Sequence, residues 1–237
     1  MIEEAIILAG GLGTRLRGVI KDIPKPMADI NGKPFLEYLL FYLNRQGLKK
    51  IVLSVGYKYN IIKDYFGDFF LNTELLYSIE DEPLKTGGAI LKALNFVNGK
   101  DVFILNGDTL FKINLYQFYE FHSTKDSKLT ISLKPTEHPD RYGIVDINNS
   151  YRIMAFFEKG QKEKGLINGG IYLLNKEFFL NFDLPDKFSF EKDFLEKCYK
   201  DYEFYGFPSD SYFIDIGIPE DYERAKRDIE NLKFNNE

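Results

Sequence analysis

The sequence predicts an α/β fold in which a mostly parallel, mixed β-sheet is flanked by helices. Through about residue 125, short apolar runs that end at glycine or aspartate alternate with segments of helical periodicity. This alternation is typical of parallel strands joined by crossover helices. From about Lys128 onward, short strand-like runs follow one another with polar turns between them, which is typical of antiparallel additions to a sheet.

The first part of the chain contains four expected strands. They are the apolar runs 5–9, 51–55, 75–79 and 102–105. A helix is expected to start at Pro34, because leucines at positions 36, 39, 40 and 43 recur at helical spacing, and Gly47 is a suitable end. Two more helices are expected over residues 61–66 and 89–96. These units predict a sheet wrapped by helices.

The second part contains shorter strand-like runs. They cover residues 129–133, 143–147, 153–157, 170–174 and 213–214. One helix is expected over residues 190–199 and a last one from Pro219, whose apolar residues follow at helical spacing. Because the chain has no internal repeat and no Pro/Gly/Ser-rich linker, we expect one domain over residues 1–237.

Composition excludes several classes of protein. The 237 residues have a formal net charge of −5, one cysteine and no tryptophan, which is ordinary globular composition. The mild acidity argues against a nucleic-acid partner, and no apolar stretch reaches the roughly 20 residues of a membrane span. Cys198 alone permits no internal disulfide, which favours a reducing, cytoplasmic location without membrane association.

The most informative segment is the glycine-rich run at residues 8–16, L-A-G-G-L-G-T-R-L. It follows the first expected strand, at the edge where α/β sheets bind ligands. Glycines there let backbone N–H groups approach phosphate oxygens, and Arg15 adds a cation. Leu16 stands where a dinucleotide fingerprint needs glycine, and no P-loop Gly-Lys-Ser/Thr follows. The expected nucleotide-binding residues of this run are Leu8, Ala9, Gly10, Gly11, Gly13 and Thr14.

A second segment, Pro24-Lys25-Pro26, adds another cation. The two prolines restrict the backbone on both sides of Lys25, so that its ammonium group is held in one direction. About ten residues separate Lys25 from Arg15, and both cations can face the same phosphates.

Together, L-A-G-G-L-G-T-R-L and P-K-P resemble the signature of the sugar-1-phosphate nucleotidyltransferases, or nucleotide-sugar pyrophosphorylases. The resemblance covers nearly the whole chain and is strongest to short guanylyltransferases that act on manno-configured sugars. It implies the Rossmann-like nucleotide-diphospho-sugar transferase fold, with a nucleotide-binding part over about residues 1–125 and a sugar-side part over about 126–237. Some relatives carry a C-terminal hexapeptide-repeat domain, and we expect none here.

The resemblance also implies a reaction. The expected enzyme transfers GMP from GTP to a manno-configured sugar 1-phosphate, with D-glycero-α-D-manno-heptose 1-phosphate as the expected acceptor, for surface-polysaccharide biosynthesis. The acceptor phosphate is already an anion, so the reaction needs positioning and cations rather than a general base. Arg15 and Lys25 are the expected catalytic residues. Uridylyl transfer from UTP to an N-acetylmuramate-like or hexose 1-phosphate stays open.

Two aspartates are candidates for a metal site. Asp108 follows a buried strand in Asn106-Gly107-Asp108, and Asp215 ends another apolar strand. Two carboxylates together with phosphate oxygens and water suit Mg²⁺, with Mn²⁺ as a possible substitute. The resemblance assigns the same two positions to metal. We expect Asn106 and Asp108 to contact the nucleotide as well.

An acidic loop before a helix is the candidate for reading the base. A carboxylate accepts the two N–H donors of guanine, whereas uracil offers one, so this loop favours GTP. Glu80 is our candidate, with Asp81 and Glu82 left open, and the resemblance adds Thr86, Gly87 and Gly88. The glycine pair is expected to bring backbone groups close to the base.

The sugar side is inferred mainly from the resemblance. It assigns Glu158 to sugar hydroxyls and Lys159 to the sugar phosphate. The remaining expected sugar-phosphate-binding residues are Tyr142, Gly143, Asn168 and Gly169.

Three other readings are weaker. A glycosyltransferase usually needs an Asp-x-Asp motif, and no two aspartates here are two positions apart. A non-catalytic nucleotide-sugar sensor would be expected to lose Arg15, Lys25 or a metal carboxylate, and all are present. A dinucleotide-dependent oxidoreductase lacks its fingerprint because of Leu16.

The aromatic share is high, at 16 %, and many rings have no place in this chemistry. Exposed together, they would form a patch too apolar for a monomer, so we expect a homodimer interface. The rings in question are Phe69, Phe70, Phe178, Phe179, Phe182, Phe188 and Phe204.

Overall fold

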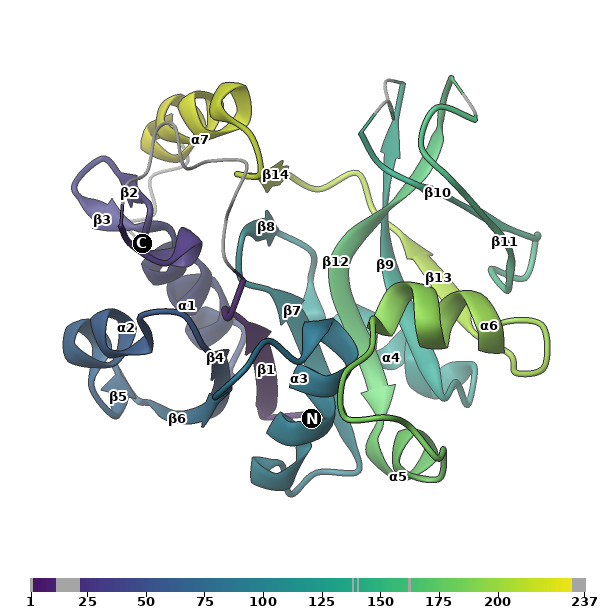
Figure 1. Cartoon of the computed structure of the whole chain (residues 1–237). Helices are drawn as coiled ribbons and strands as arrows, with labels where there is room; N and C mark the ends of the chain where they lie inside the picture. The colour runs from purple at the N-terminus through teal and green to yellow at the C-terminus, as the bar shows by residue number, and fades with distance from the viewer. Residues whose placement is uncertain (1, 12–21, 138, 140, 162, 232–237) are drawn as a thin grey trace.

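The computed structural model describes residues 2–11, 22–137, 139, 141–161 and 163–231 (Figure 1). A ten-stranded mixed sheet runs through both parts of the chain in the order β11-β10-β12-β7-β1-β4-β6-β5, with β9 beside β12 and β13 beside β9. Its parallel centre consists of β1 (Glu4–Leu8), β4 (Lys50–Val55), β6 (Thr73–Ile79) and β7 (Asp101–Asn106). This arrangement confirms the predicted α/β class.

The sheet continues into the second part of the chain through antiparallel pairs. The strands there are β9 (Leu129–Thr136), β10 (Ile144–Ile147), β11 (Ile153–Phe157), β12 (Gly165–Asn175) and β13 (Tyr205–Pro208). Strand β12 pairs antiparallel with both β7 and β9, as the short runs predict. Strand β13, which the sequence pattern did not reveal, pairs parallel with β9.

Three short pairs lie at the margins of the sheet. They are β2 (Asp29–Ile30) with β3 (Lys33–Pro34), β5 (Phe69–Phe70) with β6, and β8 (Thr109–Phe111) with β14 (Phe213–Asp215). The β8–β14 pair matters most for the site, because it joins segments that are about a hundred residues apart in sequence.

Helices cover the two faces of the sheet. The long ones are α1 (Phe35–Arg45), α2 (Tyr59–Phe66), α3 (Lys85–Ala93), α4 (Leu115–Thr124) and α7 (Pro219–Asn231). Shorter turns are α5 (Lys176–Leu180), a π-helix (Phe190–Leu195) that continues into α6 (Glu196–Cys198), and 3₁₀ turns over Lys25–Met27 and Leu94–Phe96. Helices α4 and α5 were not expected from the sequence.

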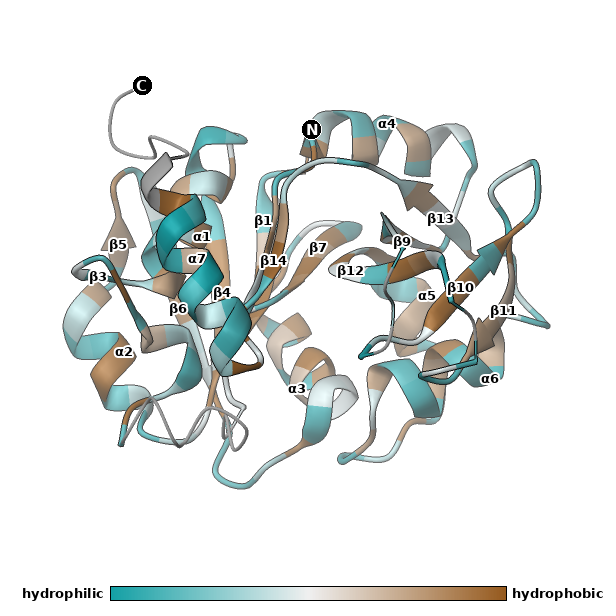
Figure 2. Cartoon of the chain, turned by 90° about the horizontal axis from the view of Figure 1, so that it is seen from above, coloured by the Kyte–Doolittle hydropathy of each residue, from teal (hydrophilic) through white to brown (hydrophobic). Residues whose placement is uncertain are grey.

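Alternation along the strands builds two apolar cores. In β7, Phe103 and Leu105 face the core shared with α1 and α7, whereas Val102 and Ile104 face the core shared with α3. This is the two-sided burial expected of a central parallel strand. In Figure 2 the strands β1, β4 and β7 are largely apolar in colour, while α7 carries long hydrophilic stretches. Among the described residues, no helix is long and apolar enough to span a membrane.

The aromatic surplus lies mainly inside the molecule, so the predicted exposed patch is wrong. Phe179, Phe188 and Phe204 are at most 2 % exposed, and their rings pack in the core between β12 and the π-helix. Phe178 and Phe182 pack against the same core. Of the seven rings, Phe69 is the clearly exposed one, at 66 %. Burial among other aromatic rings, rather than assembly, accounts for these residues.

Candidate active site

A cavity of about 640 Å³ opens at the carboxyl ends of the central strands. This is the edge at which open α/β sheets bind ligands. Most of the predicted nucleotide-binding residues gather there, and the ones that line the cavity are Leu8, Ala9, Gly10, Gly11, Lys25, Glu80, Thr86, Asn106 and Asp108. Gly13, Thr14 and Arg15 lie outside the described residues. Five residues that were not among the predicted binding residues complete the lining: Pro26, Pro83, Lys85, Ala89 and Glu191.

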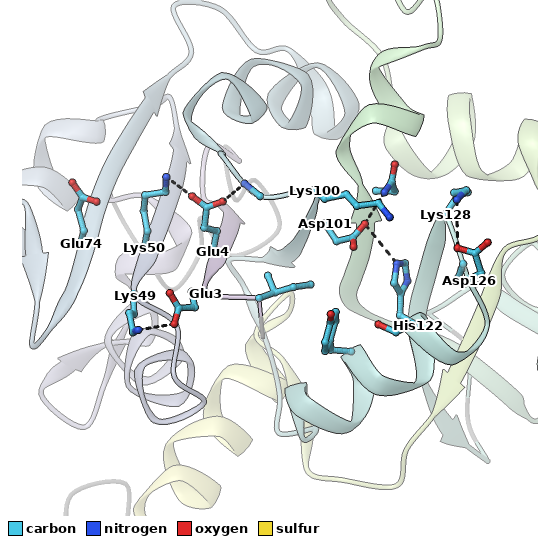
Figure 3. A pocket seen from close by; sticks show the side chains of 16 residues that line it. Glu3, Glu4, Lys49, Lys50, Glu74, Lys100, Asp101, His122, Asp126 and Lys128 are labelled. Atoms are coloured by element: carbon cyan, nitrogen blue, oxygen red, sulfur yellow. Dashed lines mark hydrogen bonds and ion pairs between the residues drawn. The ribbon is translucent and has the colours of Figure 1, made fainter.

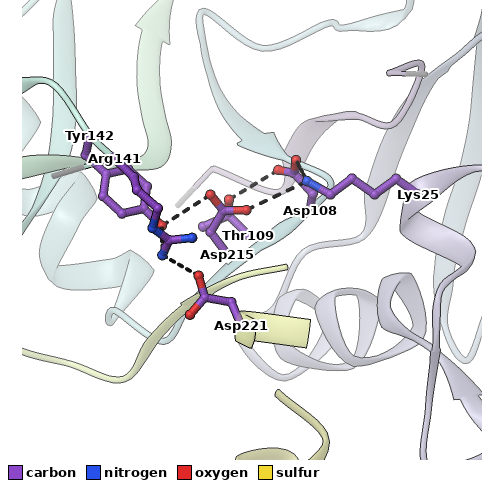
Figure 4. A network of polar contacts seen from close by, with 7 residues as sticks. All are labelled: Lys25, Asp108, Thr109, Arg141, Tyr142, Asp215 and Asp221. Carbon is purple, nitrogen blue, oxygen red and sulfur yellow. Dashed lines mark hydrogen bonds and ion pairs between the residues drawn. The ribbon is translucent and has the colours of Figure 1, made fainter. Parts of the chain in front are cut away.

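Lys25 stands between the two predicted metal carboxylates (Figure 4). Its Nζ atom lies 2.5 Å from Oδ2 of Asp108 and 3.8 Å from Oδ1 of Asp215. The three residues therefore share one polar cluster, as the sequence suggested for the two aspartates. Pro26 is buried beneath the turn, which holds Lys25 over the cavity.

Local pairing explains why Asp108 and Asp215 meet. Strand β14 pairs with β8 so that Asp215 lies opposite Thr109, the residue after Asp108. The Ile216 N–H then donates a hydrogen bond to the Asp108 carbonyl at 3.0 Å. The pairing of β8 with β14, two strands far apart in sequence, thus fixes the separation of the two carboxylates.

The environment of Asp215 suits a divalent cation. Its Oδ1 atom is buried, and none of the described residues donates a hydrogen bond to it. Burial, followed by the nearby charge of Asp108, raises the pKa of the Asp215 carboxyl. The Lys25 ammonium, 3.8 Å from this oxygen, offsets part of the cost of burying a carboxylate oxygen that has no hydrogen-bond donor, and a divalent cation would offset more of it. Among the described residues, no group of three or more His, Cys, Asp or Glu side chains is placed to hold a metal ion.

Tyr142 lies beside Asp215. Its hydroxyl lies 3.3 Å from Oδ2 of Asp215, and the neighbouring Arg141 forms an ion pair with Asp221 at the start of α7. Burial and the charge of Asp215 raise the pKa of the Tyr142 hydroxyl, which stays a donor to that carboxylate. Arg141 and Asp221 gave no signal in the sequence beyond being charged.

Glu80 is the acidic-loop residue that faces the cavity. Its Oε1 accepts a hydrogen bond from Ser54 at 3.1 Å, and its Oε2 accepts one from the Leu84 N–H at 3.0 Å. Asp81 and Glu82 are exposed and do not line the cavity. A side chain at Gly10 would collide with Glu80, because its Cβ would lie 2.6 Å from Oε1. Glycine at this position therefore lets the first loop approach the acidic loop.

The glycine pair at the start of α3 is closely packed. A Cβ at Gly87 would lie 2.2 Å from the Phe188 ring, and one at Gly88 would lie 2.0 Å from the Asp186 carbonyl oxygen. The Gly87 N–H already donates to the Phe188 carbonyl at 2.9 Å. Both glycines are buried and do not line the cavity, so they serve close packing of α3 against residues 186–188.

A smaller cavity of about 260 Å³ lies beside β10, β11 and the π-helix. Four of the predicted sugar-side residues line it: Gly143, Glu158, Lys159 and Asn168. Glu158 also forms an ion pair with Lys192 at 3.3 Å. Gly169 does not line this cavity, because it is packed against Phe111, whose ring would lie 2.4 Å from an added Cβ.

A third cavity, of about 690 Å³, opens at the opposite edge of the sheet (Figure 3). It contains none of the predicted site residues. Several of its charged side chains form ion pairs, namely Glu4–Lys50, Glu3–Lys49 and Asp126–Lys128. The buried His122 also belongs to it and hydrogen-bonds Thr130 at 2.8 Å.

Comparison with known proteins agrees with this geometry. A model of the nucleotidyl transferase family matches residues 4–231. The chain is 51 % identical to a D-glycero-α-D-manno-heptose 1-phosphate guanylyltransferase of Aneurinibacillus thermoaerophilus, over 96 % of this chain and 99 % of that protein. It is 52 % identical to a protein of the same description from Campylobacter jejuni, over 92 % and 96 % of the two chains.

Solved structures also resemble this chain over nearly its whole length. The crystal structure of HddC from Yersinia pseudotuberculosis superposes with a TM-score of 0.87 at 44 % identity, covering 96 % of this chain and 100 % of that one. HddC complexed with GMP-PN superposes with a TM-score of 0.85 at 43 % identity over the same shares.

Proposed function

Because the chain belongs to the nucleotidyl transferase family, we propose that it transfers GMP from GTP to D-glycero-α-D-manno-heptose 1-phosphate, forming a GDP-sugar and pyrophosphate. The observation that carries this proposal is the cluster of Lys25, Asp108 and Asp215 at the edge of a cavity large enough for a nucleotide. Over more than nine tenths of its length, the chain is more than 50 % identical to two heptose 1-phosphate guanylyltransferases. This identity supports the choice of both substrates.

In this reaction the chain itself supplies positioning and positive charge. The backbone of residues 8–11 lines the cavity and would hold the triphosphate, with Arg15 added from the motif. The Lys25 ammonium, held on Asp108, would offset the charge that develops at the α-phosphate as pyrophosphate leaves. Asp108 and Asp215 would hold Mg²⁺ or Mn²⁺, which supplies further neutralisation of the phosphates when bound.

The smaller cavity would hold the sugar. Lys159 would pair with the sugar phosphate, while Glu158 and Asn168 would bond sugar hydroxyls. The phosphate oxygen of the acceptor is already charged, so it attacks the α-phosphorus without transfer of a proton. The protein therefore needs no general base for this step.

Glu80 is proposed to read the base. A carboxylate has about four lone-pair sites, of which Ser54 and Leu84 occupy two. The remaining two suit the two N–H donors on the edge of guanine. Uracil, with one donor, would leave one site unused, so GTP is favoured over UTP.

A broader role is proposed as well. The GDP-sugar would serve surface-polysaccharide biosynthesis in the cytoplasm, and the chain would act as a homodimer. The single Cys198 supports the location. The aromatic rings do not support the dimer, because all of the seven except Phe69 are buried or partly buried within one chain, so sedimentation at micromolar concentration has to test it independently.

A pyrophosphate-release screen tests the function. GTP, UTP, ATP and CTP are each combined with the 1-phosphates of manno-heptose, mannose, glucose and N-acetylmuramate in Mg²⁺. We expect the highest kcat/KM for GTP with manno-heptose 1-phosphate. Highest activity with UTP and N-acetylmuramate 1-phosphate would replace the proposed substrates, and no pyrophosphate from any pair would favour the sensor.

A further inference from the structure

Glu191 lies where the two cavities meet. It lines the larger cavity together with Thr86 and Asn106, and it lines the smaller one together with Asn168. It belongs to the π-helix Phe190–Leu195, a helix type that is rare and frequent at functional sites. Its carboxylate is therefore placed between the sites proposed for the nucleotide and for the sugar.

On the nucleotide side, Glu191 holds Thr86. The Thr86 hydroxyl donates to Oε2 of Glu191 at 2.7 Å and accepts the Phe190 N–H at 2.9 Å. Because the Phe190 N–H can only donate, the hydroxyl proton of Thr86 is left to point at the carboxylate. Ser189 donates to the same oxygen at 3.1 Å.

On the sugar side, a chain of hydrogen bonds runs from β12 to the same carboxylate. The Gly170 N–H donates to Oδ1 of Asn168 at 2.9 Å, and Nδ2 of Asn168 donates to the Tyr172 hydroxyl at 2.8 Å. Tyr172 then donates to Oε1 of Glu191 at 3.1 Å. Burial and the charge of Glu191 raise the pKa of Tyr172 well above its ordinary value, so the hydroxyl keeps its proton.

The start of this chain coincides with an irregularity in β12. The register with β9 shifts between Asn168 and Tyr172, and Gly170 has a φ of +74°. A Cβ at Gly170 would lie 2.9 Å from Nδ2 of Asn106, which lines the larger cavity. Bulges of this kind re-aim side chains next to active sites. Here the bulge places Asn168 in the smaller cavity.

We propose that Glu191 is a positioning residue that joins Thr86 and Asn168 into one hydrogen-bonded unit and thereby aligns the two substrates for in-line transfer. In every described bond to its carboxylate Glu191 is the acceptor: from Thr86, which lines the larger cavity, from Ser189, and from Tyr172, which is bonded to Asn168 of the smaller cavity. Among side chains, an ionised carboxylate alone offers two oxygens that both only accept. Glutamine would present an NH₂ group to one side and break the unit there. The identity of the two substrates rests on the proposed function.

The alternative is that Glu191 only stabilises the π-helix. The same turn contains a carboxylate that does this without touching either cavity. Oδ2 of Asp193 accepts the Ser189 N–H at 2.8 Å, and Asp193 lines neither of the two cavities. Asp193→Asn is therefore a matched control for Glu191→Gln, two residues away on the same element.

The test compares kinetics and binding in these variants. Wild-type turnover is measured first and tests the proposed function by itself. For Glu191→Gln we expect kcat to fall by about 10- to 100-fold, as for misaligned reactants. We expect KM for GTP, and the affinity for a non-hydrolysable GTP analogue, to stay within about threefold of wild type, since the phosphate-binding loop is unchanged. Asp193→Asn should lower the thermal midpoint of unfolding at least as much as Glu191→Gln does. Its kcat, however, should stay within about threefold of the wild-type value.

A second variant, Tyr172→Phe, tests the hydrogen-bonded chain on the sugar side. Because Tyr172 and Glu191 act in one chain, the double variant should lose about as much kcat as the worse single variant. Equal losses of kcat in Glu191→Gln and Asp193→Asn would overturn the inference in favour of a structural role. A kcat of Glu191→Gln within threefold of wild type, or additive losses in the double variant, would overturn it too.

Discussion

The Nζ atom of Lys25 lies 2.5 Å from Oδ2 of Asp108, although 83 residues separate them in sequence. The lysine comes from a proline-flanked turn and the aspartate from the end of a central strand. Their contact places a cation and a carboxylate at one edge of the larger cavity, and Asp215 joins them from β14. This relationship is the centre of the proposed chemistry.

Replacing Lys25 should affect turnover more than folding. Lys25→Ala removes the ammonium that would offset charge in the transition state, so we expect kcat to fall by about 100-fold or more. Pyrophosphate release at saturating GTP and manno-heptose 1-phosphate measures this effect. Lys49→Ala, whose partner is Glu3 at the opposite edge of the sheet, is the control and should keep wild-type turnover. A Lys25→Ala enzyme with wild-type kcat would remove Lys25 from the mechanism.

Replacing Asp215 should weaken metal binding directly. Asp215→Asn removes one of two carboxylates, and its buried Oδ1 no longer carries charge. Calorimetric titration of the substrate-free protein with Mn²⁺ should give an affinity at least about 10-fold lower than wild type. Asp210→Asn, at an exposed carboxylate paired with Lys134, serves as the control. Unchanged Mn²⁺ affinity in Asp215→Asn would show that the metal binds elsewhere.

Chelation with EDTA should also stop turnover, and Mg²⁺ should restore it.

Replacing Glu80 should change the choice of base. Glu80→Gln turns one acceptor of the guanine edge into a donor, so kcat/KM with GTP should fall by about 10- to 100-fold. With UTP the loss should be smaller, because uracil uses one donor. Asp81→Asn, in the same loop but exposed, should leave both values near wild type. Equal losses for GTP and UTP would mean that Glu80 supports the loop, through Gly10 and Leu84, without reading the base.

The buried His122 should make stability depend on pH. Burial lowers its pKa to about 4, and the charge of Asp101 at 3.9 Å offsets this only in part. An unfolded histidine has a pKa of about 6.5, so between pH 6.5 and 4 the unfolded chain binds a proton that the folded chain does not. The contribution of neutral His122 to the free energy of unfolding is therefore fully present above pH 6.5. It decreases as the pH falls from 6.5 to 4, by about 3 kcal/mol in total.

Denaturant unfolding at several pH values measures this dependence. The free energy of unfolding of wild type minus that of His122→Gln should fall between pH 6.5 and 4 and level off below, since other titrating groups cancel in the difference. A difference that stays constant with pH would show that His122 titrates normally. Its position beside the third cavity, away from the site, means that kcat should not follow the same curve.

The spacing of apolar residues predicted those strands and helices whose own sequence carries the pattern. The four central strands lie within two residues of the predicted runs, and the leucines of α1 form one buried face. Helix α4 was missed because its aromatic and polar residues form no clear apolar stripe. Strand β13 was missed because it is four residues long and its partner, β9, lies about 70 residues earlier. Short elements of this kind are stabilised by tertiary pairing rather than by their own sequence.

The aromatic residues illustrate the limit of composition. Their number suggested an exposed patch, but Phe179, Phe194 and Phe204 pack against one another in a core. Composition counts rings without locating them, and a ring buried in a core and a ring buried in an interface contribute the same apolar area.

What the sequence by itself determined was the kind of chemistry. The glycine-rich run, the lysine between prolines and the two strand-end aspartates are local patterns whose physical meaning is readable without coordinates. Tertiary structure alone decided which acidic residue of residues 80–82 faces the cavity, and that Gly87 and Gly88 serve packing. It also decided the place of Glu191, whose partner Thr86 lies 105 residues away. Contacts across such distances depend on how strands pair and helices pack, and no local pattern encodes them.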